Sequence, residues 1–357
     1  MIALLLVVAV LVGLGIGHGV WKAAQNATGP SGSALAPGGT GSNGQGSGNA
    51  ATIAQKVNPA LVDINTSLSY QHGQAAGTGI VLTSDGVVLT NNHVITGATS
   101  ISVTDVGNGS TYPADVVGYD RSHDIAVLKL RGASGLQTAE IGNSDKLSVG
   151  DYVVGLGNAG GVGGTPSSAE GTIVGLNRSI TASDEANGTS EQLTGLIETD
   201  ADIQPGDSGG ALVNSSGQVV GIDTAASAGF SFQTQGGQGF AIPINQAMSI
   251  AHQIRSGQAS STVHIGPTAF LGVLVDTTAS AQGATLSGVV PRGPAAQAGL
   301  QSGDTITSLG GKPVDSPNTL TTLVGQYHPG ETVPVEWVDS AGLSHHATIT
   351  LTTGPAA

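Results

Sequence analysis

The chain has 357 residues, enough for two domains and terminal segments. Its formal net charge is -14 and it has no cluster of Lys and Arg, so we expect no nucleic-acid partner. It has no Cys, which excludes a thiol nucleophile, a Cys-ligated metal and disulfides. Aromatic residues make up only 3%, so the core must be built from Val, Ile, Leu and Ala, and the many Gly, Thr, Ser and Val residues favour short strands and turns over helices.

The N-terminal segment, residues 1–22, is apolar apart from His18, Lys22 and a few small residues. About 20 such residues can span a bilayer. A signal peptide usually has a basic start, a shorter apolar region and a cleavage site. The sequence therefore predicts an exported chain that is anchored to the membrane by this segment, or secreted if the segment is cleaved. Residues 23–52 are rich in Gly and Ser and are expected to form a flexible linker.

Residues 53–256 form the first β-rich region. A short helix is expected at 53–57, and Asn58-Pro59 ends it. The strands predicted in a first set cover 61–66, 79–83, 87–90, 101–103, 114–119, 125–130 and 152–155. Those of a second set cover 171–176, 193–199, 211–213, 219–223 and 239–241. This density of short strands predicts antiparallel barrels rather than alternating strands and helices. Two Gly-rich loops (157–168 and 227–237) and a helix at 246–254 with one apolar face complete the region.

The first candidate for a catalytic segment is Gly206-Asp207-Ser208-Gly209-Gly210, directly before an apolar strand. A Ser hydroxyl needs a base to take its proton and donors for the oxyanion that follows. The glycine before Asp207 lets the backbone aim N–H groups into one anion-binding concavity. The stretch alone fits an ordinary turn equally well. His93 follows one apolar strand and Asp124 precedes another, so the three together predict a Ser-His-Asp triad.

Three segments then carry a resemblance to a family: Thr90-Asn91-Asn92-His93-Val94, Asp124-Ile125-Ala126-Val127-Leu128-Lys129 and Pro205-Gly206-Asp207-Ser208-Gly209-Gly210. They resemble the catalytic blocks of the HtrA/Deg family, which are chymotrypsin-fold serine proteases with C-terminal PDZ domains. The resemblance extends from about residue 51 to the C-terminus. It implies a mostly β fold with two six-stranded antiparallel barrels. It also implies Ser208 as nucleophile, His93 as general base and Asp124 as the group that orients it, with Gly206, Asp207 and Ser208 forming the oxyanion hole.

The C-terminal region, residues 266–354, follows a linker at 257–265. Its segments 270–273, 293–300 and 303–309 resemble a bacterial PDZ domain, a small α+β fold. The resemblance implies that Phe270, Leu271, Gly272 and Val273 form the loop that binds a peptide's terminal carboxylate. The following edge strand would accept the peptide as an added strand.

The substrate pocket is less determined by the sequence. Asp202, six residues before Ser208, is either the carboxylate of a pocket that selects Lys or Arg, or a solvent-facing loop residue. Asp223, Thr224 and Ala225 would form a pocket wall that is small and, apart from the carboxylate, mostly apolar. We therefore expect cleavage after small or medium aliphatic residues. Asp207 replaces the usual Asn of the family and is expected to accept backbone hydrogen bonds.

The resulting hypothesis is an exported serine endopeptidase that cleaves misfolded or specific envelope proteins. Its implied partners are polypeptide substrates, peptide C-termini at the PDZ domain, the membrane through the N-terminal segment, and two further copies of the chain in a homotrimer. The alternative is a peptide-binding adaptor or chaperone with an inert protease domain. No cofactor is expected, and no metal, because His123, His345 and His346 lack further ligands at metal-like spacing.

Overall fold

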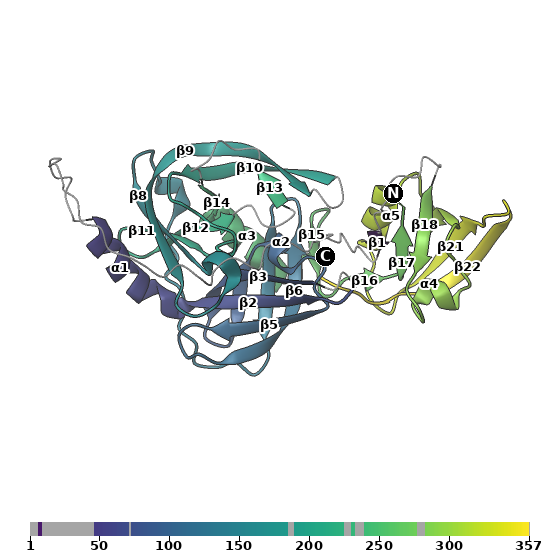
Figure 1. Ribbon diagram of the computed structural model, residues 1–357, viewed down its shortest axis with the longest axis horizontal. Helices are drawn as coiled ribbons and strands as arrows, with labels where there is room; N and C mark the ends of the chain where they lie inside the picture. Colours follow the sequence, from purple (N-terminus) through teal and green to yellow (C-terminus); the bar gives the residue numbers. More distant parts are fainter. Residues whose placement is uncertain are drawn as a thin grey trace, which may run out of the picture.

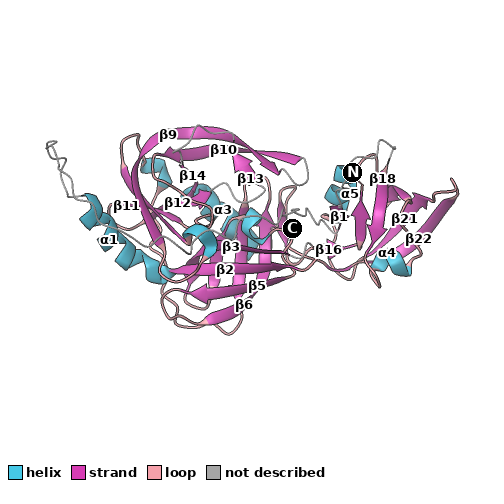
Figure 2. Cartoon of the chain, in the orientation of Figure 1, coloured by secondary structure: helices cyan, strands magenta, loops and turns pink. Residues whose placement is uncertain are grey.

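The computed structural model describes residues 6–8, 46–70, 73–184, 189–224, 230–232, 239–276 and 283–356. Strands dominate it, and the helices are few and mostly short (Figure 2). A larger lobe, drawn in purple to green, lies beside a smaller lobe drawn in green to yellow (Figure 1). The larger lobe contains both barrels, and the smaller one contains the C-terminal domain.

The first barrel is a closed ring of antiparallel strands. Its members are β2 (Leu61–Leu68), β3 (Gly73–Thr83), β4 (Val87–Thr90), β5 (Ser100–Asp105), β6 (Thr111–Asp120) and β7 (Ile125–Leu130). They neighbour one another in the order β6-β5-β2-β3-β4-β7, and β6 also pairs with β7. Aliphatic side chains such as Ile64, Val103 and Leu128, all with 0% exposure, fill the interior.

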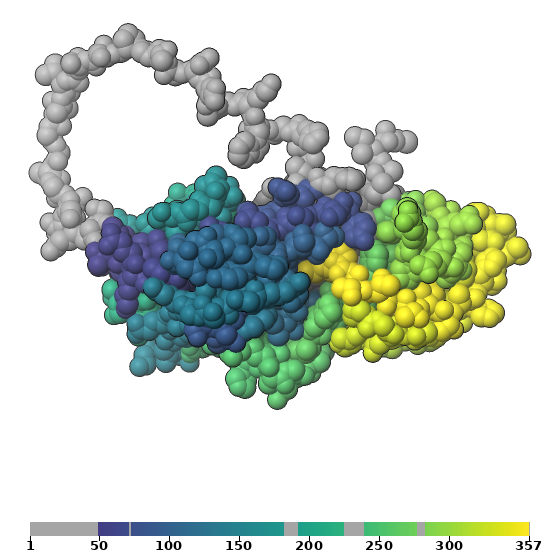
Figure 3. Space-filling model, turned by 90° about the horizontal axis from the view of Figure 1, so that it is seen from below, coloured from purple at the N-terminus to yellow at the C-terminus, as the bar shows by residue number. Residues whose placement is uncertain are grey.

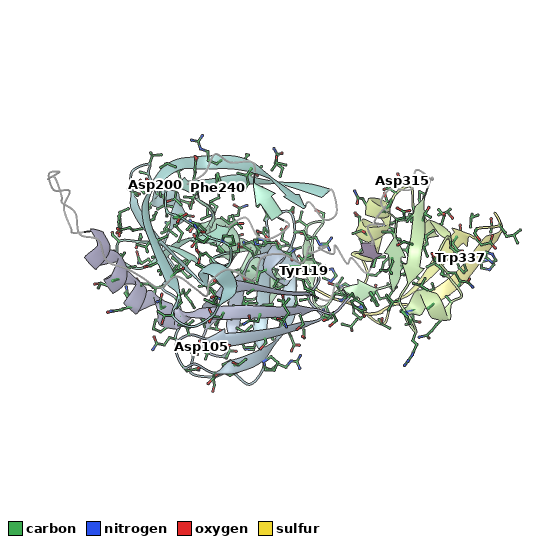
Figure 4. All side chains as sticks on the ribbon, in the orientation of Figure 1. Asp105, Tyr119, Asp200, Phe240, Asp315 and Trp337 are labelled. Atoms are coloured by element: carbon green, nitrogen blue, oxygen red, sulfur yellow. The ribbon has the colours of Figure 1, made fainter. Side chains whose placement is uncertain are left out.

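The second barrel is built in the same way. Its members are β8 (Tyr152–Gly157), β9 (Ser167–Asp184), β10 (Thr189–Thr199), β11 (Ala211–Asn214), β12 (Val219–Thr224) and β14 (Gly239–Pro243). The order is β10-β14-β12-β11-β8-β9, and the pairing of β10 with β9 closes the ring. Phe240 lies in this part of the lobe (Figure 4). The prediction of two six-stranded antiparallel barrels is confirmed.

Two details of the sequence interpretation are wrong. Residues 152–155 were expected among the strands of the first set, but β8 pairs with β9 and β11 in the second barrel. The long connection after β7, which contains only the short turn η2 (Ser144–Lys146), takes the chain from one barrel to the other. The segment 227–237 was expected to be a loop, yet β13 (Phe230–Phe232) pairs with the extended β9. The rest of that segment lies outside the described residues.

Two longer helices, α1 (Gly46–Val57) and α3 (Ile244–Arg255), and several single turns accompany the barrels. The single turns include η1 (Asn58–Ala60), α2 (Asn92–Ile95) and η3 (Ala159–Gly161). Helix α1 packs on β8 and β9 and begins within the segment expected to be a linker. Helix α3 buries the apolar face that its sequence predicted: Ala247, Ile250, Ala251 and Ile254.

The expected membrane segment, residues 1–22, lies outside the described residues except for β1 (Leu6–Val8). Over the ranges that the structure does describe, no helix has the length and apolar character needed to cross a membrane.

The smaller lobe is a curved sheet with two helices. The sheet contains β1, β17 (Val273–Val275), β18 (Ala284–Val289), β19 (Thr305–Leu309), β21 (Thr332–Val338) and β22 (Ser344–Thr350), in that order, with β20 (Lys312–Pro313) paired to β19. The helices are α4 (Pro294–Gln297) and α5 (Pro317–Val324). Its own core includes Leu286, Ile306 and Val335, and the side chain of Trp337 is marked in Figure 4. The predicted small α+β domain is confirmed.

The two lobes are joined by several backbone contacts. Strand β15 (Val263–Ile265) lies within the segment expected to be a linker and pairs with β6 of the first barrel. Strand β16 (Ala269–Phe270) pairs with β23 (Thr352–Thr353). Beyond β23, the amide and carbonyl of Ala356 bond to the Ala98 carbonyl (2.9 Å) and the Gly97 amide (2.7 Å). The yellow C-terminal segment thus reaches the larger lobe (Figure 3), just after the helix that carries His93.

Candidate active site

His93 and Asp124 lie together at the edge of the first barrel. His93 is on the single turn of α2, directly after β4, and Asp124 immediately precedes β7. Strands β4 and β7 are paired, which brings these two ends together. The His93 ring Nδ1 lies 2.8 Å from Asp124 Oδ2, and the His93 backbone N–H donates to Asp124 Oδ1 at 2.9 Å. Both carboxylate oxygens therefore contact the same histidine, which fixes the direction of its ring.

Two polar neighbours hold Asp124 in place. Its backbone has φ = 54°, which is uncommon for a residue other than glycine. The Asn91 side chain donates to the Asp124 carbonyl at 2.9 Å. Thr224, at the end of β12, donates its hydroxyl to Asp124 Oδ2 at 3.4 Å. Because β12 belongs to the second barrel, the candidate site lies where the two barrels meet.

Ser208 lies in a tight turn that leads into β11. The Asp207 N–H donates to the Gln204 carbonyl, and the Gly210 N–H donates to the Asp207 carbonyl. Gly206 has φ = 100°, and a Cβ built on it would lie 2.2 Å from the Asn158 carbonyl oxygen. Only glycine fits there, because this conformation and this close backbone approach both exclude a side chain. The local sequence thus forms a tight turn that only glycine permits at residue 206, and this turn positions the buried Ser208 directly before β11.

Thr78 in β3 connects this turn to the first barrel, and sequence reasoning did not identify it. Its backbone N–H donates to the Ser208 carbonyl at 2.8 Å, and its hydroxyl donates to the Gly206 carbonyl at 2.8 Å. The same hydroxyl accepts from the Asn158 N–H at 2.8 Å. The signal available for this role was that Thr78 is a polar residue between Gly77 and Gly79, in a part of the strand that is buried on both faces. Asn91 and Thr224 were likewise assigned no role next to Asp124.

Asp207 is 3% exposed and points away from solvent. Its two carboxylate oxygens accept hydrogen bonds from the Gln204 N–H (2.9 Å) and the Ser167 hydroxyl (3.0 Å). Burial raises the pKa of Asp207, and these two hydrogen bonds lower it in part. The residue bonds a backbone amide, as the sequence had indicated, and a side-chain hydroxyl as well.

The residues assigned to the substrate pocket lie in different surroundings. Asp202 is exposed and is hydrogen-bonded by the side-chain amide of Gln204. Asp223 and Thr224 are buried in β12, with 0% and 1% exposure. Ala225 lies outside the described residues. Of the two interpretations of Asp202, the solvent-facing one agrees with its exposure.

The loop expected to bind a peptide carboxylate precedes β17. Phe270, Leu271 and Val273 are buried, and Gly272 has φ = 79°. The Leu271 and Gly272 carbonyls accept from the amides of Ala295 (2.9 Å) and Val290 (2.9 Å). These bonds use the carbonyl side of the loop. The loop is thus held by α4 and by the residue that follows β18, next to β17, which pairs with β1.

A metal site is not apparent in the part of the chain that the structure describes: it contains no group of three or more His, Asp or Glu side chains that could hold an ion. His123 is instead paired with Asp120 at 2.8 Å, and His345 with Asp339 at 2.8 Å.

Comparison with known proteins agrees with this architecture. Residues 77–222 match the family model of a trypsin-like peptidase domain, and residues 285–336 match that of a PDZ domain. The chain is 37% identical over 321 residues to the serine protease PepD of Mycobacterium tuberculosis, covering 85% of this chain and 66% of PepD. It is 37% identical over 267 residues to the periplasmic serine endoprotease DegP of Escherichia coli, covering 71% of this chain and 52% of DegP. The chain thus spans between half and two thirds of these curated relatives.

Solved structures give similar matches. A serine endoprotease from Yersinia pestis is 31% identical, with 85% of this chain and 97% of that chain covered and a TM-score of 0.46. The HtrA-type protease AlgW with a tripeptide is 30% identical, with 85% and 97% covered and a TM-score of 0.48. The fold and the matched family models define a trypsin-like peptidase domain followed by a PDZ domain. The chain belongs to the HtrA/Deg family of serine proteases.

Proposed function

We propose that the chain is a serine endopeptidase that works outside the cytoplasm. The observation that carries the proposal is the contact of both Asp124 carboxylate oxygens with His93, at 2.8 and 2.9 Å. This contact selects the tautomer with the proton on Nδ1 and leaves Nε2 as the basic nitrogen. Ser208, on the turn that Thr78 of β3 hydrogen-bonds and that leads into β11, is the proposed nucleophile.

In the proposed reaction, Ser208 Oγ attacks the peptide carbonyl and gives its proton to His93 Nε2. Asp124 stabilises the imidazolium that results. The N–H groups of Gly206 and Ser208 stabilise the oxyanion of the tetrahedral intermediate. When the intermediate collapses, His93 gives the proton to the leaving amine and an acyl-enzyme remains. Water then attacks the ester by the same steps and releases Ser208.

We propose polypeptide substrates, held in part by the PDZ domain. The edge of β17 accepts an antiparallel strand, since Leu6–Val8 pairs there in register with Val273–Val275. This pairing supports addition of a peptide at the same edge, with its carboxylate near Gly272. The names of the periplasmic relatives support export. Action on misfolded or specific envelope proteins is a part of the proposal that rests on the family resemblance. Anchoring through residues 1–22 and a homotrimer are parts of the proposal that rest on the sequence and on family membership.

The exposed position of Asp202 supports cleavage after small or medium aliphatic residues, rather than after Lys or Arg. Mass spectrometry of the products of denatured casein tests this preference. Product termini that are chiefly Lys and Arg, with a preference lost in Asp202→Ala, would contradict it.

An active-site probe tests the activity itself. A fluorophosphonate should label the full chain at Ser208 and should not label Ser208→Ala. His93→Ala should also lose labelling, because the hydroxyl is then without its base. Ser216→Ala, which changes an exposed serine on the turn after β11, should label like the unaltered chain. A chain that binds peptides but neither labels nor cleaves casein would favour the adaptor or chaperone alternative.

A further inference from the structure

Two carboxyl groups are buried next to each other beneath the turn of Ser208. Asp207 is 3% exposed and Asp223 is 0% exposed. Neither side-chain oxygen of Asp223 has a hydrogen-bond partner among the described residues. The backbone amide of Leu156 approaches closely enough to favour the ionised form of Asp223, but outside hydrogen-bond geometry. A buried polar group without a partner is unfavourable, so this carboxyl requires an explanation.

Strand β8 provides the space for both carboxyls. Gly155 and Gly157 are two residues apart and so face the same side of the strand. A Cβ on Gly155 would lie 2.3 Å from Ile203 Cδ1 and 3.3 Å from Asp223 Oδ2, so the Ile203 side chain shares this space with the carboxyl. A Cβ on Gly157 would lie 2.7 Å from Asp207 Oδ1. The two carboxyls therefore occupy neighbouring positions over the same face of β8, next to the two glycines.

No described cation neutralises this pair. The ion pairs that Lys, Arg and His side chains form within the described ranges include neither Asp207 nor Asp223. The strand partners of Asp223 and of Gly155 are apolar, Ala241 on β14 and Ala169 on β9.

The other titratable groups nearby also leave the pair uncompensated. Asp202, on the loop before Asp207, adds negative charge and raises the pKa of its neighbour further. Asp124 is paired with His93 and accepts a hydrogen bond from Thr224, the residue that follows Asp223.

Two such carboxyls cannot both ionise, because burial and mutual repulsion act in the same direction. Burial, followed by the neighbouring Asp207, raises the pKa of Asp223 well above its usual value. Asp207 has an amide and a hydroxyl donor that favour its anion.

We propose that Asp207 and Asp223 hold one proton between them, on Asp223, and that this uncharged acid is a positioning residue for the Ser208 turn.

The backbone of Asp223 explains how it acts on the nucleophile. Its carbonyl accepts from the Gly209 N–H at 2.9 Å, and its own N–H donates to the Gly210 carbonyl at 2.9 Å. These bonds hold β12 against the residues that follow Ser208, while Asp207 precedes Ser208. Ionisation of Asp223 places two anions on the two segments that support the nucleophile. Their repulsion displaces the turn and lowers kcat more than it raises KM. This consequence for turnover rests on the proposed peptidase function.

Carbon-13 NMR of the full chain, labelled at the aspartate carboxyl carbon, tests the protonation without requiring activity. Ser208→Ala serves as the background, so that self-cleavage does not interfere. We expect one buried aspartate to remain a protonated acid at pH 7, and its signal to be absent from Asp223→Asn. The proposal would be overturned if all aspartates are ionised at pH 7. It would also be overturned if the signal of the protonated acid is lost in Asp207→Asn and kept in Asp223→Asn.

The pH dependence of unfolding provides a second measurement. The folded chain keeps a proton on Asp223 that the unfolded chain has released above about pH 4. The unfolding equilibrium constant of the unaltered chain should therefore rise by up to about tenfold per pH unit above pH 4, relative to that of Asp223→Asn, and the ratio of the two constants should be independent of pH below about pH 4. Asp115→Asn, which removes an exposed carboxylate paired with Arg131, should follow the unaltered chain. Parallel curves for the unaltered chain and Asp223→Asn would overturn the proposal.

Kinetics then separate the positioning role from the peptidase function. At pH 7, Asp223→Asn should keep kcat within about threefold, since a neutral amide replaces a neutral acid. At alkaline pH the kcat of Asp223→Asn should persist to higher pH than that of the unaltered chain, and the acid side of the two pH profiles should coincide. If kcat falls at the same alkaline pH in Asp223→Asn and in the unaltered chain, Asp223 has no positioning role. Absence of any turnover with the expected NMR and unfolding results would refute only the peptidase function.

Discussion

Replacement of Gly206 by alanine should abolish most of the turnover and leave the barrels folded. The new Cβ would lie 2.2 Å from the Asn158 carbonyl oxygen and within 3.0 Å of the amides of Gly160 and Gly161. All three atoms belong to the backbone, so the turn must move by about 1 Å to restore normal contact. A shift of about 1 Å at a reacting group costs about 10²-fold, and loss of one oxyanion donor costs about 10²–10³-fold. We therefore expect kcat to fall by about 10²–10³-fold.

Gly160→Ala is the matched control for this change. Gly160 lies in the facing loop with φ = 75°, but a Cβ there would have no neighbour within 4 Å. Both substitutions carry the cost of a left-handed backbone, about 1–2 kcal/mol, and only Gly206→Ala adds the collision. Cleavage of a chromogenic peptide, together with circular dichroism melting, compares them. If the two variants have the same kcat, or if Gly206→Ala is within about threefold of the unaltered chain, the assignment of the oxyanion hole is refuted.

The remaining predictions concern the triad, the core, the contact between the lobes and the PDZ loop. Ser208→Ala should lower turnover by about 10⁶-fold and Asp124→Asn by about 10⁴-fold with the fold intact; casein cleavage by purified Ser208→Ala, free of contaminants, would contradict the triad. Leu128→Ala, at a position with 0% exposure, should lower the free energy of unfolding, measured by urea denaturation, by about 2–5 kcal/mol. The control Leu343→Ala, at 62% exposure, should change it by less than about 0.5 kcal/mol. Ala356→Asp places a charge in a buried site and should release the C-terminal segment to limited proteolysis while the barrels stay folded. A peptide with a free C-terminus should bind the full chain by calorimetry, and equal affinity of its amidated form would contradict a carboxylate-binding loop.

Local sequence determined the parts of the protein that depend on neighbouring residues. The turn around Ser208 requires glycines at neighbouring positions, and His93 and Asp124 each stand at the end of an apolar strand. The apolar face of α3 follows from its 3.6-residue period. The barrels followed from the density of short strands and from the family resemblance, since each strand could be identified without knowing its partner.

Tertiary structure decided which strands pair and what surrounds each carboxyl. Strand β8 pairs with β9 and β11, and no local pattern distinguishes that barrel from the other. All six residues of β12 are buried, so the alternation that normally distinguishes the two faces of a strand is missing at Asp223. Its place beside Asp207 depends on two glycines of β8 that are more than 60 residues away in the chain. The exposure of Asp202, six residues from the buried Ser208, depends in the same way on how the loop before Ser208 packs, because burial is a property of contacts between distant segments.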